Sequence, residues 1–186
     1  MEQSKMAFYK SGTKVKDKML LPMFCLILAF SGCQSTQIVD NEYSNLQSFY
    51  KITLPGGSWE KTKINNECLT LWNKENNANF AIISHPAKSN KATLDTLCKQ
   101  LFVGIKEREI LKKQYVYIDS QRVLNIVLEG ELDSFKLRIS AYIIKSKGVI
   151  CDIVYWSSPD KFDISLDDFE RAVNSFKFIG DQRSEV

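Results

Sequence analysis

The sequence has few of the residues on which metal binding and most catalysis depend. His85 is the only histidine among 186 residues, and no two of the five cysteines have the spacing of a zinc site or a Cys-x-x-Cys motif. A metal site would therefore lack ligands. The chain also has no glycine-rich phosphate loop and no internal repeat. We therefore predict no metal site and no cofactor.

The chain also lacks an excess of charge once its first 32 residues are set aside. The whole chain has 25 basic and 22 acidic residues, of which five lysines and two acidic residues lie within residues 1–32. The remainder thus holds 20 basic and 20 acidic residues and has no net charge. A nucleic-acid partner has no electrostatic support.

What the sequence does contain is a leader. Five lysines between residues 5 and 18 are followed by an apolar run at 19–30 and by two small residues, Ser31 and Gly32. This order is typical of a secretory signal peptide. An uncleaved membrane anchor is the alternative, but the run is shorter than the roughly 20 residues that a spanning helix needs. We therefore expect residues 1–32 to be a signal peptide.

The end of this leader resembles the lipobox of bacterial lipoproteins, in which a hydrophobic residue and two small residues precede an invariant cysteine. Phe30 occupies the position of the usual leucine, and Cys33 is the cysteine. The resemblance implies cleavage before Cys33 and attachment of diacylglycerol, detectable as palmitate, so that a membrane anchors the mature protein on the periplasmic side of the cell envelope. Because Gln34 and Ser35 lack the aspartate that retains many enteric lipoproteins in the inner membrane, we expect the outer membrane.

Three cysteines follow the anchor, in an exported and potentially oxidising compartment: Cys68, Cys98 and Cys151. Cys98 lies on the apolar stripe of a predicted helix and Cys151 on one face of a predicted strand. Both side chains could point into one layer. A disulfide between Cys98 and Cys151 is one prediction, and two buried core thiols are the other.

The mature chain is predicted to consist of a tether, one domain and a tail. Residues 33–47 are polar and without periodicity, which is typical of a tether between membrane and domain. A single domain is expected over residues 48–180, because this length supports one hydrophobic core but not two. Residues 181–186 form a polar tail.

Strands dominate the predicted domain. The first strand, at 49–54, stops at Pro55 and two glycines, and the strands at 68–72 and 80–84 form a hairpin. A meander of further strands follows at these positions: 115–119, 123–131, 135–145 and 149–156. The last of them is apolar on both faces apart from Asp152, which is typical of a central strand covered on both sides.

Two amphipathic helices complete the domain. Thr93 can cap the first, which is predicted to run to about Ile110, with Lys112 and Lys113 near its end. Ser165 can cap the second, whose buried stripe comprises Leu166, Phe169, Ala172, Val173 and Phe176. An antiparallel sheet with a helix packed on each face makes an α+β domain.

These elements and their aromatic residues resemble the PsbP/Mog-like (DcrB-like) fold, an αβα sandwich, over roughly residues 46–179. The resemblance rests on the sequence Phe-Tyr-Lys-Ile-Thr-Leu-Pro at 49–55, on Trp59, and on a closing helix that ends in Ser-Phe-Lys-Phe at 175–178. Members of this family include an extrinsic subunit of photosystem II, a Ran-binding nuclear factor and bacterial envelope lipoproteins. The resemblance implies a non-enzymatic protein.

Candidate reactive residues each have a structural alternative. Asp167, Asp168 and Glu170 could form an acidic metal patch, but acidic residues in a first helical turn are ordinary partners of the helix dipole. His85 could act as a base, but it lies beside a proline at a strand end and has no nucleophile motif to activate. We interpret His85 as a turn residue at the surface.

Aromatic residues offer candidate binding surfaces. Tyr142, Tyr155 and Trp156 could line a groove, although aromatic residues on a covered sheet usually belong to the core. Trp59 and Trp156 are the candidate interface residues, because they lie in loops, at 55–59 and 156–160, that a rigid sheet would hold in place.

Two hypotheses on function follow. The first is a non-enzymatic, membrane-anchored module of the bacterial envelope that binds an envelope protein. The second is a small periplasmic ligand-binding protein or an enzyme with an unrecognised site. A deep pocket with convergent polar side chains would favour the second, and a shallow apolar patch would favour the first.

Overall fold

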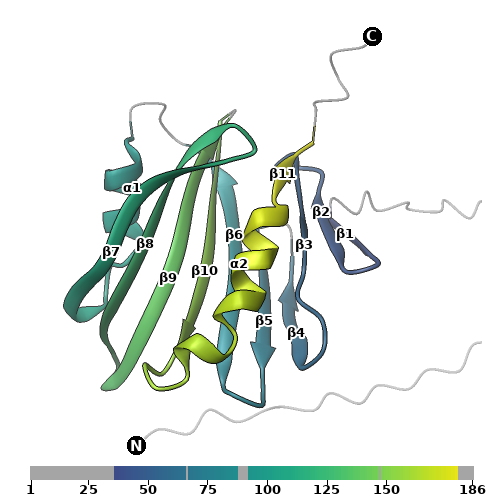
Figure 1. The fold of residues 1–186 in the computed structure, drawn as a ribbon. Coiled ribbons are helices and arrows are strands. Elements are labelled where there is room, and N and C mark those ends of the chain that lie inside the picture. Colours follow the sequence, from purple (N-terminus) through teal and green to yellow (C-terminus); the bar gives the residue numbers. More distant parts are fainter. Residues whose placement is uncertain (1–35, 66, 88–91, 147, 180–186) are drawn as a thin grey trace, which may run out of the picture. The chain divides into compact units, whose positions relative to one another are not determined.

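The structure is a computed structural model that describes the following residues: 36–65, 67–87, 92–146 and 148–179 (Figure 1). The predicted signal peptide at 1–32, the lipidated Cys33 and the polar tail at 181–186 lie outside the described residues. No helix within the described ranges is long and apolar enough to cross a membrane.

Seven strands of the described chain form one antiparallel sheet in the order β4-β5-β6-β10-β9-β8-β7. These strands are β4 (Trp59–Ile64), β5 (Cys68–Asn73), β6 (Ala78–Pro86), β7 (Lys106–Ile118), β8 (Gln121–Leu132), β9 (Phe135–Ser146) and β10 (Val149–Ser157). The predicted β5–β6 hairpin and the meander from β7 to β10 are confirmed. β10 pairs with β6 and β9 and is buried on both faces, as its apolar sequence predicted.

A smaller sheet corrects the prediction of a tether at 33–47 over its described part, residues 36–47. It has the strand order β1-β2-β3-β11 and comprises β1 (Thr36–Val39), β2 (Glu42–Asn45), β3 (Tyr50–Thr53) and β11 (Lys177–Phe178). Asp40 and Asn41, with φ angles of 50° and 64°, make the two-residue turn that joins β1 to β2. Tyr43 and Asn45 are fully buried. The polar composition of this segment concealed a hairpin whose alternate residues enter the core.

The first helix is shorter than predicted. α1 (Leu94–Leu101) begins at Thr93, whose Oγ1 accepts a hydrogen bond from the Thr96 N–H. It ends at Leu101 with Phe102 as its C-cap, and Gly104, with a φ angle of 99° that favours glycine, lies in the turn that follows. Lys112 and Lys113, expected beside the helix end, lie instead in β7, where they pair with Val127 and Ile126 of β8. Pairing with a long neighbouring strand outweighed the helical periodicity of residues 102–110.

The two faces of the large sheet carry separate hydrophobic clusters, and the alternation of β9 assigns residues to them as predicted. Ile139, Ala141 and Ile143 belong to a cluster with Leu97 and Cys98 of α1, which we call the α1 cluster. The opposite face holds the α2 cluster, named after α2 (Leu166–Ser175), which crosses the front of the sheet in Figure 1.

Aromatic rings make up much of the α2 cluster. The Phe169 ring of α2 lies 5.3 Å from the Tyr155 ring and 5.5 Å from the Phe80 ring, measured between centroids. The predicted stripe of the closing helix is confirmed, since Phe169, Ala172 and Val173 are buried. Ser165 does not cap α2 through its side chain. Its Oγ accepts hydrogen bonds from the amide groups of Asn73 and Asn76.

Candidate functional site

The predicted disulfide between Cys98 and Cys151 is corrected by the sheet. Cys98 of α1 lies in the α1 cluster, whereas Cys151 of β10 points to the α2 cluster on the other face. The three cysteines among the described residues, which include Cys68, are all free. The alternative of buried core thiols is therefore confirmed for Cys98 and Cys151, and burial raises the pKa of the Cys151 thiol well above its usual value.

The candidate interface tryptophans are not exposed anchors. Trp59 is 7% exposed, its ring centroid lies 6.4 Å from those of Phe80 and Tyr155, and its indole N–H donates to Asp168 Oδ2 at 3.0 Å. Trp156 lies on the other face of the sheet, half-buried against the α1 cluster. The structure therefore places Trp59 in the core and does not bring the two rings together.

The acidic residues of α2 have partners on the protein. Asp168 pairs with Arg171 in addition to Trp59. Glu170 Oε2 accepts a hydrogen bond of 2.6 Å from the Tyr142 hydroxyl, and this contact adds to burial in raising the pKa of Tyr142. The described residues contain no group of three or more acidic, cysteine or histidine side chains that could hold a metal ion.

Tyr142 and Tyr155 belong to the core, which is the alternative that we favoured for them. Tyr155 is fully buried and its hydroxyl donates to the backbone oxygen of Phe162 at 2.7 Å. Tyr142 is buried beneath α2 and packs on Phe169, with ring centroids 5.9 Å apart. No groove opens between them and Trp156, because the sheet separates their faces.

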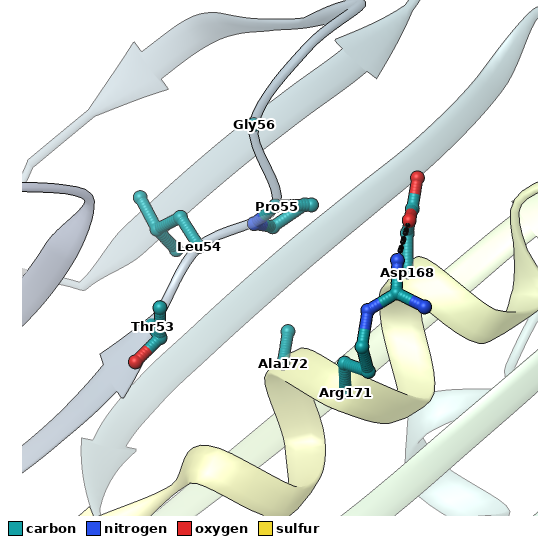
Figure 2. Close-up of a pocket in the computed structure, with 7 residues that line it drawn as sticks. All are labelled: Thr53, Leu54, Pro55, Gly56, Asp168, Arg171 and Ala172. Atoms are coloured by element: carbon teal, nitrogen blue, oxygen red, sulfur yellow. Dashed lines mark hydrogen bonds and ion pairs between the residues drawn. The ribbon is translucent and has the colours of Figure 1, made fainter.

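A groove of about 240 Å³ runs between helix α2 and the segment from the last residue of β3 to Gly56 (Figure 2). Thr53, Leu54, Pro55 and Gly56 form one wall, and Asp168, Arg171 and Ala172 form the other. The Thr53 N–H donates to Ser175 Oγ at 2.8 Å, which ties this segment to α2. Part of the loop predicted to carry the interface, at 55–56, thus borders a hollow on the surface.

A second cavity, of about 310 Å³, lies between α1 and the large sheet. The described residues that line it are Ile83, His85, Leu97, Gln100, Leu101 and Asp152. Asp152 pairs with Ile83 across β10 and β6, and His85 pairs with Ile150, so both polar side chains face α1. His85 is therefore a strand residue at a cavity wall, which corrects its interpretation as a turn residue.

Asp152 is the charged residue in the otherwise apolar run of β10 at 149–156. The residue is 7% exposed, and its Oδ1 is covered and has no hydrogen-bond partner among the described residues. Burial raises the pKa of its carboxyl group to about 7. A single carboxylate within an apolar strand was the signal that could have located this site, because buried ionisable groups with raised pKa values gather at functional sites.

Asp152 predicts a pH dependence of stability. Its pKa is raised from 3.8 to about 7 on folding, so between these values only the folded state keeps the proton. The stabilisation is complete below pH 4 and is lost as pH rises through 7, by up to about 4 kcal/mol. We expect urea unfolding at pH 5 and pH 8 to differ less for Asp152→Asn than for the wild type. Equal pH dependence in both proteins would contradict this expectation.

Solved structures share this fold. The cyanobacterial PsbP protein CyanoP from Synechocystis sp. PCC 6803 aligns over 80% of this chain and 95% of its own length, with 14% identity and a TM-score of 0.56. PA94 of Pseudomonas aeruginosa, a protein of unknown function, aligns over 64% of this chain and 96% of its own length, with 9% identity and a TM-score of 0.52. A Bacteroides thetaiotaomicron protein aligns over 72% of this chain and 46% of its own length, with 10% identity and a TM-score of 0.51.

The chain therefore has a PsbP-like fold, as the sequence resemblance predicted. No family model matches the chain, and no curated protein matches it by sequence. At identities of 9% to 14% the likeness shows the fold alone. What the protein does must be argued from its own residues.

Proposed function

We propose that this protein is a lipid-anchored, non-enzymatic module of the bacterial cell envelope that binds another envelope protein. It would be attached through Cys33, facing the periplasm, with the outer membrane as its location. The PsbP-like fold is compatible with this function, and the lipobox-like sequence before Cys33 supplies the anchor.

The observation that carries the proposal is the short distance along the chain between the anchor and the folded domain. Cys33 precedes β1 by three residues, which span at most about 11 Å when fully extended. A lipid on Cys33 would therefore hold the small sheet close to the membrane surface. Confinement of two partners to one surface raises their effective concentration, so a modest interface suffices for binding.

The groove of Figure 2 is the candidate interface for this partner. Its walls combine the buried Leu54 and Ala172 with the exposed guanidinium of Arg171, whose side chain is 72% exposed. Apolar floors with a polar rim are typical of protein interfaces, and arginine is enriched among residues that dominate binding. The groove differs from the predicted interface in excluding both tryptophans.

Site-specific crosslinking tests this function. A photoreactive residue at position 171 of the full-length protein, in its own membranes, should join it to one envelope protein. The same residue at position 117 is the control, since Tyr117 is 75% exposed and lies at the far edge strand β7. Cys33→Ser should reduce the crosslink from position 171. Equal crosslinking from both positions, or none from position 171, would contradict the proposed interface.

A further inference from the structure

The cavity beside α1 is bordered by a buried carboxyl group, one oxygen of which has no hydrogen-bond partner among the described residues. Asp152 lines the cavity, is 93% buried, and has a covered Oδ1 that accepts no hydrogen bond. A buried polar group without a partner costs about 1–3 kcal/mol, and more when it is charged. Such groups in native proteins usually have a partner or a functional role.

None of the ion pairs found among the described residues includes Asp152. Burial is the cause of its raised pKa. The groove of Figure 2 differs in this respect, because the charges of Asp168 and Arg171 compensate each other there. The uncompensated carboxyl group therefore distinguishes the cavity beside α1.

The other residues that line the cavity indicate the chemistry and the size of a fitting ligand. Ile83 of β6 and Leu97 and Leu101 of α1 are aliphatic, while His85 and Gln100 add two polar groups. The volume of about 310 Å³ suits a small molecule rather than a peptide or a nucleotide. A fitting ligand combines an aliphatic body with one strong donor.

We propose that this cavity binds a small aliphatic primary amine, whose ammonium group donates hydrogen bonds to Asp152 while its carbon chain packs against Ile83, Leu97 and Leu101. An ammonium group brings the Asp152 carboxyl group both a hydrogen-bond donor and the opposite charge, whereas a hydroxyl group brings a donor alone. Charge-assisted hydrogen bonds are about twice as strong as neutral ones. The site lies on the face of the sheet opposite α2, so it does not depend on the proposed protein interface.

The single histidine of the chain makes the test specific. His85 lines the cavity, so selective labelling of histidine places one NMR reporter at the site in the full-length protein in its own membranes. We expect n-hexylamine at constant pH to shift the His85 resonance in a saturable way. We expect n-hexanol, which has the same carbon chain, to bind at least tenfold more weakly. The absence of a saturable shift with n-hexylamine, or equal affinities for the two probes, would overturn the proposal.

Three variants test whether n-hexylamine binding depends on the Asp152 carboxyl group rather than on the charge of the protein in general. Asp152→Asn preserves the shape of the side chain and should weaken n-hexylamine binding at least tenfold. Asp163→Asn is the matched control, because the Asp163 side chain is 81% exposed outside the cavity, and it should bind like the wild type. Gln100→Glu adds a second carboxylate at an exposed position of α1 and should tighten binding severalfold. Unchanged affinity in both Asp152→Asn and Gln100→Glu would refute the assigned site.

Discussion

Replacing Cys33 with serine should abolish incorporation of labelled palmitate and release the protein from its membrane or direct it elsewhere. Serine has no thiol to form the thioether with diacylglycerol. Burial of acyl chains contributes about 0.8 kcal/mol per methylene group, so that a single chain holds weakly and two hold stably. Metabolic labelling followed by fractionation of the membranes measures both effects.

Cys68→Ser is the control for the lipidation experiment, since Cys68 is half-buried in β5 and lies outside the leader. This variant should incorporate palmitate as the wild type does. A wild-type protein that takes up no label would show that residues 30–33 do not act as a lipobox. The module would then lose the membrane confinement on which the proposed function rests.

Replacing Trp59 with alanine should lower the free energy of unfolding by about 3–5 kcal/mol, the range for truncation of a large buried ring. The ring is 7% exposed, packs near Phe80 and Tyr155, and loses its hydrogen bond to Asp168. Trp59→Phe should recover much of this loss, because it restores a ring without the indole N–H. Urea unfolding of the full-length variants gives the measurement.

Tyr117→Ala provides the comparison for an exposed aromatic residue. Tyr117 is 75% exposed on β7, so its truncation should change the unfolding free energy by no more than about 0.5 kcal/mol. If Trp59→Ala left stability unchanged and weakened binding of a partner, Trp59 would be an interface residue. Because Trp59 is buried, we expect the variant to lose stability instead.

The elements with a sustained pattern were predictable from sequence. The strict alternation from Leu137 to Ile143 assigned β9 and its two faces, and the stripe through Phe169 and Val173 assigned α2. Both patterns extend over many residues, so the local preference of the sequence and the packing in the fold favour the same element. The helix predicted up to Ile110 failed because a few residues satisfied helical spacing where β8 offered a strand partner.

The candidate site was less predictable. Asp152 was visible as a carboxylate in an apolar strand, but its link to His85 required the register between β10 and β6. The groove of Figure 2 required the segment after Thr53 to lie beside Arg171. Contacts between residues that lie tens of positions apart leave no periodic trace in a single sequence.

The sequence by itself determined the neutral charge of residues 33–186 and the alternation of the long strands, because each of these is a local property of composition or spacing. The signal peptide at 1–32 and the lipidation of Cys33 stay predictions from the sequence. Only the tertiary structure decided which helix packs on which face of the large sheet. It placed Cys98 and Cys151 on opposite sides of the sheet. It also buried Trp59 in the α2 cluster, with its indole N–H donating to Asp168. A strand with two apolar faces does not specify which helix covers which face, since that depends on chain crossings and strand order, and these join residues far apart in the sequence.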